Sequence, residues 1–105
     1  MSVARITTIN FKSKEDADKS IEDYSSNAPN EFPEAEQLLQ FRASDTTVMA
    51  ISLYSDNEAM ERASAARSKR MSANESTFKV VDTKTGEITL NHKTKWFLRL
   101  LESKI

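Results

Sequence analysis

The alternation of apolar and polar residues near the start of the chain predicts a β-strand. Residues 3–11 read VARITTINF, which is rich in β-branched side chains and places a strongly apolar set on one side of an extended chain. Ser13 follows, with acidic residues shortly after it, as is typical of a helix N-terminus. We therefore expect a short amphipathic helix over residues 14–26, ended by the turn-forming sequence SSNAPNEFPE.

Two apolar runs in the middle of the chain predict a β-hairpin. Residues 35–43 have propensities that allow a helix, but Leu39, Phe41 and Ala43 alternate as they would in a strand. The sequence SDT then resembles a tight turn before TVMAISLY, residues 47–54. Two strands joined by a short turn explain this pattern better than a helix does. Because the second run is apolar on both parities, we expect both faces of the sheet to be buried.

The second half of the chain repeats the order of helix and strand. A capping-box pair that begins at Ser55 predicts a helix through residues 59–71, which contain no proline or glycine. Residues 78–83 begin another strand. KTGE, which contains the only glycine, Gly86, is expected to form a turn into a returning strand over residues 88–92.

The order of these elements is strand, helix, strand, strand, helix, strand, which is the pattern of the ferredoxin-like α+β fold. We expect one domain over residues 1–92, which ends in a C-terminal hairpin, and an amphipathic, helical tail over residues 93–105. The tail is basic and aromatic, which allows contact with a membrane surface or a partner protein. Packing on the domain or across a dimer is favoured, because an exposed apolar patch would reduce solubility. The contact residues proposed for it are Trp96, Phe97, Leu100 and Leu101.

Composition narrows the classes of function. The 105 residues carry a formal net charge of -1, which gives no whole-chain reason to expect nucleic acid as a partner. The chain lacks cysteine, so thiolate metal sites are excluded and a reducing, cytoplasmic location fits. One glycine cannot form a glycine-rich phosphate loop, and one histidine cannot form a multiple-histidine metal site. No run approaches the ~18 apolar residues of a membrane span, and no signal peptide is visible.

Residues 48–59 resemble the antibiotic biosynthesis monooxygenase-like family. They form an apolar strand that ends in an aromatic residue, then Ser-Asp-x-Glu-Ala, then an amphipathic helix. Many members have Trp where this chain has Tyr54. At the level of element order the resemblance covers residues 3–92. It implies a homodimer whose two four-stranded sheets pack into an α/β barrel.

The resemblance also implies an activity, which is cofactor-free oxygenation of polycyclic aromatic substrates or, in one branch, degradation of haem. The haem branch combines Asn, Trp and His, with the His on the second helix. This chain has Asn10 on its first strand but neither His nor Trp on that helix. We therefore expect no haem and no other cofactor or metal.

Three residues are expected to lie near the gap between the helices and the sheet, where a small ligand would bind. Asn10 and Tyr54 can hydrogen-bond a substrate oxygen, and Arg67 can stabilise an enolate or a carboxylate. The alternative is that Tyr54 covers the edge of the core and Asn10 bonds locally. His92 has a side chain suited to general-base catalysis, but no acidic partner lies near it in the sequence, which favours an ordinary surface position.

Three functions follow from these observations. The leading one is a cofactor-independent monooxygenase-like protein that binds an aromatic or enolisable ligand between its helices and its sheet. The second is a non-catalytic homodimer that binds a ligand or a protein. The third is an acid-base isomerase of the muconolactone-isomerase type. A cavity that contacts Asn10, Tyr54, Arg67 or His92 would favour a ligand site, whereas a filled gap would exclude both enzymes.

Overall fold

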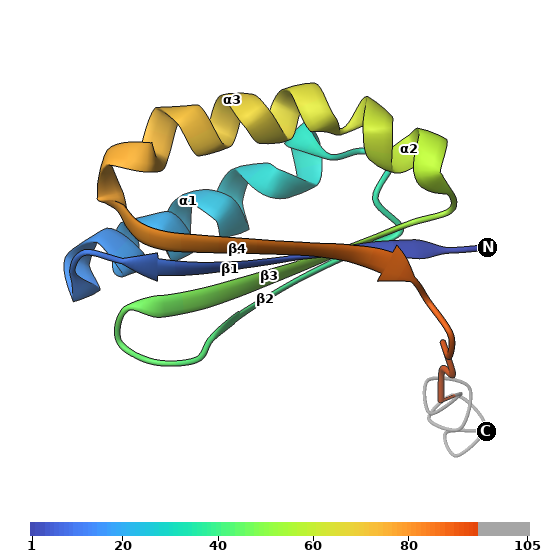
Figure 1. Cartoon of the computed structure of the whole chain (residues 1–105), viewed down its shortest axis with the longest axis horizontal. Coiled ribbons are helices and arrows are strands. Elements are labelled where there is room, and N and C mark those ends of the chain that lie inside the picture. Colours follow the sequence, from blue (N-terminus) through green and yellow to red (C-terminus); the bar gives the residue numbers. More distant parts are fainter. Residues whose placement is uncertain (95–105) are drawn as a thin grey trace, which may run out of the picture.

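A computed structural model describes residues 1–94 and shows an antiparallel sheet with helices on one face (Figure 1). The strand order β2-β3-β1-β4 places the first strand in the interior of the sheet, between the third and the fourth. This arrangement confirms the α+β, ferredoxin-like fold. The four strands are β1 (Val3–Phe11), β2 (Gln37–Arg42), β3 (Thr47–Tyr54) and β4 (Phe78–Glu87).

Helix α1 (Lys14–Glu31) is longer than predicted. It begins after Ser13, whose hydroxyl accepts a hydrogen bond from the Asp16 amide at 3.1 Å. The expected turn after residue 26 is wrong, since the helix continues through Pro29. A proline removes one intrahelical hydrogen bond, but the neighbouring Ala28 is buried in the core. Tertiary packing therefore extends the helix beyond the limit that local propensity suggests.

The predicted second helix is divided in two, α2 (Asn57–Arg62) and α3 (Ser64–Asn74). Its N-terminal cap is Asp56 rather than Ser55, because the Asp56 carboxylate accepts a hydrogen bond from the Ala59 amide at 2.8 Å. The break lies at Ala63, whose amide donates a hydrogen bond to the Met60 carbonyl at 3.1 Å. This bond spans three residues, as in a 3₁₀-helix, and not the four of an α-helix. A short 3₁₀ turn, η1 (Glu75–Thr77), connects α3 to β4.

Strand β4 also differs from the prediction. The residues KTGE continue the strand to Glu87, and Gly86 does not adopt a positive φ. Pairing with β1 explains this, because Gly86 lies opposite Ala4 and Glu87 opposite Val3. Residues 88–94 form no returning strand, so the C-terminal hairpin is wrong. The helix expected further along the tail lies outside the described residues.

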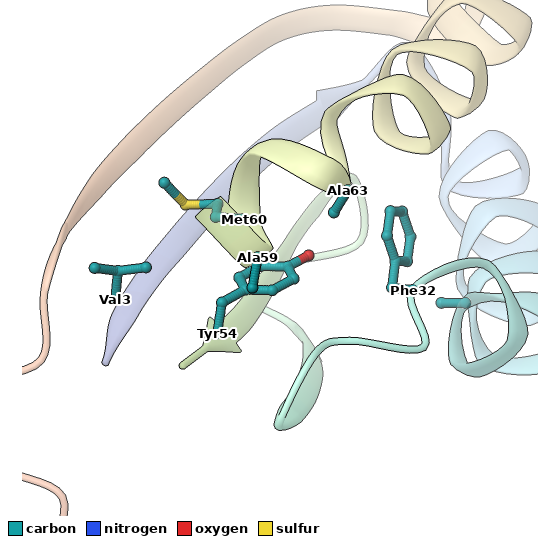
Figure 2. Packing of buried hydrophobic residues seen from close by; sticks show 7 residues of the cluster. Val3, Phe32, Tyr54, Ala59, Met60 and Ala63 are labelled. Atoms are coloured by element: carbon teal, nitrogen blue, oxygen red, sulfur yellow. The ribbon is translucent and has the colours of Figure 1, made fainter. Parts of the chain in front are cut away.

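The core on the helix-covered face is divided into two clusters. The larger cluster lies beneath α2 and contains Tyr54, which Figure 2 shows among the apolar side chains around it. The smaller cluster lies near the start of α1, where the Phe11 ring meets Phe78 edge-on with a centroid distance of 5.6 Å. The members of the larger cluster are Val3, Ala28, Phe32, Tyr54, Ala59, Met60 and Ala63, and those of the smaller are Phe11, Ala17 and Val48.

The other face of the sheet, which we call the open face, carries no helix among residues 1–94 (Figure 1). Leu39 and Phe41 on β2 are each 46% exposed, and Val80 on β4 is 58% exposed. Ala4 and Leu53 are buried on this face, and the other apolar side chains of β1 and β3 there are half-buried. The exposed and half-buried apolar residues of the open face are Ile6, Leu39, Phe41, Met49, Ile51 and Val80.

Candidate ligand-binding site

A cavity of about 70 Å³ lies between the helices and the sheet. Residues of both core clusters contribute to its walls, and polar side chains separate the two clusters there. The strands contribute side chains of one parity, and the helices α1 and α3 cover them. The polar and aromatic residues that line it include Arg5, Thr7, Ser20, Tyr24, Gln40, Ser52, Tyr54 and Arg67.

Arg5 enters the cavity because of the alternation of β1. It has the parity of Val3 and Phe11, which are buried against the helices, and it is itself 8% exposed. Its Nη2 atom lies 3.5 Å from the hydroxyl oxygen of Ser64 on α3, a long hydrogen bond to a neutral group. The Arg5 guanidinium is therefore buried between the sheet and the helices, and its single protein partner among the described residues is uncharged.

Arg67 reaches the same cavity from α3. Its Nη2 donates to the Thr83 hydroxyl at 2.9 Å and to the Thr7 hydroxyl at 3.2 Å. Burial lowers the pKa of Arg67, and the positive charge of Arg5 lowers it further. The two guanidinium groups thus repel each other across a site that contains only neutral hydrogen-bonding groups near them.

The other arginines of the described chain are neutralised by carboxylates. Arg70 forms ion pairs with Asp23 and Glu31 that connect α3 to α1, the first at 2.6 Å. The remaining pairs are Arg42 with Asp18 at 2.6 Å and Arg62 with Glu34 at 2.7 Å. Within residues 1–94, Arg5 and Arg67 form no such pair, and no Asp, Glu or His lines the cavity. The cavity is therefore electropositive.

Tyr54 ends β3 and is 1% exposed. Its hydroxyl points toward the interior, in the direction of Ala63 and Phe32 (Figure 2). Within the described chain this hydroxyl forms no hydrogen bond. Every fully buried polar side-chain atom there has a hydrogen-bond partner, so the Tyr54 hydroxyl is not fully buried. The hydroxyl therefore retains contact with the cavity. Tyr24, on the α1 side, has its pKa raised by burial.

Arg70 and Asn74 lie between this cavity and an open groove on the outer surface. The groove, of about 570 Å³, runs between α1 and α3, and both residues line the groove as well as the cavity. The Arg70 guanidinium also lies 5.3 Å from the centre of the Tyr24 ring. These contacts close the cavity toward the groove.

The structure brings together two of the predicted site residues, Tyr54 and Arg67, and separates the others from them. Asn10 has the opposite parity on β1 and faces away from the helices, so it does not line the cavity. His92 is exposed beyond the end of β4 and does not line it either. The tail residues Trp96, Phe97, Leu100 and Leu101 lie outside the described residues.

Sequence reasoning missed Arg5 and Thr7. The alternation of residues 3–11 contains a signal for both, since they share the parity of the buried apolar residues. A charged side chain at such a position is rare unless it has a partner. Among residues 1–94, no group of three or more acidic or histidine side chains is placed to hold a metal ion. No helix of that part of the chain is long and apolar enough to cross a membrane.

Comparisons with solved structures agree with this architecture. The chain superposes on a variant of SnoaB, a cofactor-independent oxygenase from Streptomyces nogalater, with a TM-score of 0.71 at 15% identity, covering 89% of this chain and 98% of the other. It matches a Streptomyces coelicolor monooxygenase from the gene ActVA-Orf6, in complex with nanaomycin D, with a TM-score of 0.71 at 12% identity, covering 90% and 93%. A dimeric ferredoxin-like protein from an uncultured marine organism gives a TM-score of 0.72 at 6% identity, covering 90% and 93%.

At these identities the likeness shows a shared fold. No family model matches the sequence, and no curated protein matches it significantly. The resemblance inferred from residues 48–59 is therefore confirmed at the level of the fold, because two solved structures described as antibiotic biosynthesis monooxygenases, from Chloroflexus aurantiacus and Caulobacter crescentus, have the same architecture.

Proposed function

We propose that the protein is a homodimer that binds a small enolisable molecule in the cavity between its helices and its sheet and oxygenates it without a cofactor. The observation that supports this proposal is the electropositive cavity, where Arg67 and the Tyr54 hydroxyl meet open space. Cationic donors in a water-poor site stabilise negative charge that develops on a substrate oxygen. The solved structures with the same fold include a cofactor-independent oxygenase.

The size of the cavity restricts the ligand. An apolar cavity of about 150 Å³ holds one benzene ring. The cavity here has about 70 Å³, so a substrate as large as benzene requires its walls to move, and a polycyclic one requires a much larger movement. We therefore propose an aliphatic 1,3-dicarbonyl compound or oxo acid in place of a polycyclic substrate.

The proposed reaction uses dioxygen as the co-reactant. The substrate carbon loses a proton to water and forms an enolate, whose oxygen is held by Arg67. The enolate carbon transfers its electrons to O₂ and forms a C–O bond, giving a hydroperoxide after protonation. Loss of water then leaves a carbonyl group, so that CH₂ and O₂ become C=O and H₂O. Tyr54 would hydrogen-bond the substrate and keep the reacting carbon in place.

An oxygen electrode tests this reaction with acetoacetate and pentane-2,4-dione. We expect protein-dependent uptake of one O₂ per substrate consumed, about a hundredfold slower in Arg67→Met because one charge-stabilising donor is lost. Tyr54→Phe should also slow uptake, whereas His92→Ala should leave it unchanged, since His92 does not line the cavity. Uptake no faster than in buffer alone, with a folded protein, would exclude the oxygenase.

A non-catalytic ligand-binding dimer is the second candidate. It is favoured by the same cavity, because none of its described lining residues is an Asp, Glu or His that would remove a proton from the substrate. Ligand binding without oxygen uptake would identify this function. The isomerase has no such support, since acid-base catalysis needs groups with separated pKa values near the substrate.

We further propose that a second copy covers the open face. Leu39 and Phe41 are about half exposed there, and a symmetric contact would bury both copies of this face at once. One of the solved structures of the same fold is a dimeric ferredoxin-like protein.

The domain over residues 1–92 and the tail over residues 93–105 remain a proposed division. After β4 the described chain turns to the side of the sheet away from the helices, toward the open face (Figure 1). We propose that Trp96, Phe97, Leu100 and Leu101 pack on the domain or across the dimer. Removal of residues 93–105 should then lower the midpoint of thermal unfolding, and an unchanged midpoint would contradict this contact.

A further inference from the structure

We propose that the cavity selects a ligand that is already an anion at neutral pH, a small carboxylate held between Arg5 and Arg67. This inference rests on the proposed function in one respect, since it assumes that the same cavity is the ligand site. It adds the charge and the chemical class of the ligand, and it assigns a binding role to Arg5.

The balance of charge in the cavity favours an anionic ligand. Burying a cation without a counter-ion is costly, and buried charges in proteins are usually paired. The chain has 16 acidic residues, and the other described arginines, Arg42, Arg62 and Arg70, each contact at least one of them. Within residues 1–94 no acidic side chain lines the cavity beside Arg5 or Arg67. A bound anion supplies the missing negative charge.

The unused N–H donors of the two arginines favour a carboxylate. A guanidinium has five N–H donors in a planar fork that matches a carboxylate. Only the Nη2 atoms of Arg5 and Arg67 bond to the described protein. No polar side-chain atom there is both buried and without a partner, so the other nitrogens keep contact with open space. Both side chains line the cavity and offer these donors to it.

The size of the cavity and the lack of a basic side chain among its described lining residues restrict the ligand further. A cavity of about 70 Å³ is about half the size of one that holds benzene, so without movement of its walls it accommodates a ligand of only a few non-hydrogen atoms. No described Asp, Glu or His lines it, so the protein has no ordinary base there to ionise a neutral acid after binding. A carboxylic acid with a normal pKa is ionised in solution beforehand. Propionate satisfies both conditions.

The experiment is an NMR titration of the full chain, which follows backbone amides and arginine Nε–H signals. The probes are propionate and propionamide, which have nearly the same shape and differ in charge. We expect propionate to shift the signals of Arg5, Arg67 and Thr7 in a saturable manner and propionamide to leave them unchanged. Arg5→Met and Arg67→Met should each weaken propionate binding at least about tenfold. Arg62→Met, at an arginine already paired with Glu34, should not.

A second pair of variants tests the claim without removing an arginine. Ser52 lines the cavity from β3, so Ser52→Asp places a carboxylate beside the two guanidinium groups. It should abolish propionate binding. Ser52→Asn introduces a side chain of the same size without the charge, so propionate should bind to it at least about tenfold more tightly than to Ser52→Asp. This pair keeps the test valid if Arg5→Met does not fold.

The outcomes separate this inference from the proposed function. Equal binding of propionamide and propionate would overturn the selection of an anion and leave a ligand site in the cavity. Propionate binding that persists in Arg5→Met or in Ser52→Asp would overturn the role of the arginine pair. If acetoacetate and pentane-2,4-dione also fail to shift any cavity signal, both the inference and the proposed function are wrong.

Discussion

Arg5 occupies a position where the alternation of β1 favours an apolar side chain. The strand buries Val3 and Phe11 on the same side, and between them it places a guanidinium whose one described protein partner is a hydroxyl at 3.5 Å. A residue of this kind lowers stability, because its desolvation is not offset by a charged partner. Sites where a sequence sacrifices stability locally are often sites of binding.

This reasoning predicts the effect of Arg5→Met on stability. Methionine keeps the length of the side chain and removes the buried charge, so the free energy of unfolding should rise by about 1–3 kcal/mol. Urea denaturation without added ligand measures this change. Arg62→Met, which alters an exposed ion pair, should change the free energy of unfolding much less than Arg5→Met does. A clear loss of stability in Arg5→Met would show that Arg5 is a structural residue.

At the residue scale, the sequence allowed part of the site to be anticipated. Tyr54 and Arg67 both line the cavity, while Asn10 faces away from the helices because strand parity separates it from Arg5. The parity of Asn10 is visible in the sequence, but which face the helices cover is decided by tertiary packing. The predicted position of His92 assumed a returning strand over residues 88–92, which the structure does not contain.

At the element scale, the ion pair between α1 and β2 connects a helix to the sheet. Asp18 on α1 accepts hydrogen bonds from Arg42 at 2.6 Å and from Lys14 at 3.2 Å. The hydrogen bond from Arg42 and then that from Lys14 lower the pKa of Asp18. A carboxylate whose pKa is lower in the folded state stabilises the fold above its unfolded pKa, and this stabilisation is lost as the pH falls through the folded pKa.

The expected result concerns the pH dependence of Asp18→Asn. This variant should be less stable than the native protein at pH 7. The difference should shrink as the pH falls below about 4, the ordinary pKa of an aspartate, and towards the lower pKa of Asp18 in the folded protein. Urea denaturation over pH 2.5–7 measures it. Glu22→Gln, on the same helix and without an ion pair among the described residues, serves as the control. A constant difference across this range would contradict the pairing.

The elements were predicted unequally well. The bounds of β3 agree with the apolar run of residues 47–54, because turns on both sides interrupt it. The end of α1 and the break at Ala63 were missed, since each depends on contacts that are distant in the sequence. Strand β4 continues through Gly86 because β1 extends alongside it, and a local turn signal does not contain that information.

At the scale of the whole molecule, the open face is the largest departure from the expectation that both sheet faces are buried. Phe41 and Leu39 are half exposed in the single chain. If a second copy covers them, Phe41→Glu should shift sedimentation from a dimer to a monomer, because two carboxylates would be buried at the symmetric contact.

A matched control for this variant is Ala65→Glu, which places the same carboxylate on an exposed position of α3. It should leave the dimer intact. A native protein that sediments as a monomer at micromolar concentration would contradict the dimer directly. The order of elements predicted the fold correctly, whereas the partner of the open face is a property of the assembly that one sequence does not specify.

The most direct test of the central claim is a crystal structure of the protein grown with propionate. We predict a dimer whose open faces meet, with a propionate carboxylate in each helix-sheet cavity, within hydrogen-bonding distance of Arg5 and Arg67. The Tyr54 hydroxyl should border the same ligand. A cavity filled by protein side chains, or an Arg5 guanidinium paired with a carboxylate of the chain itself, would contradict the account.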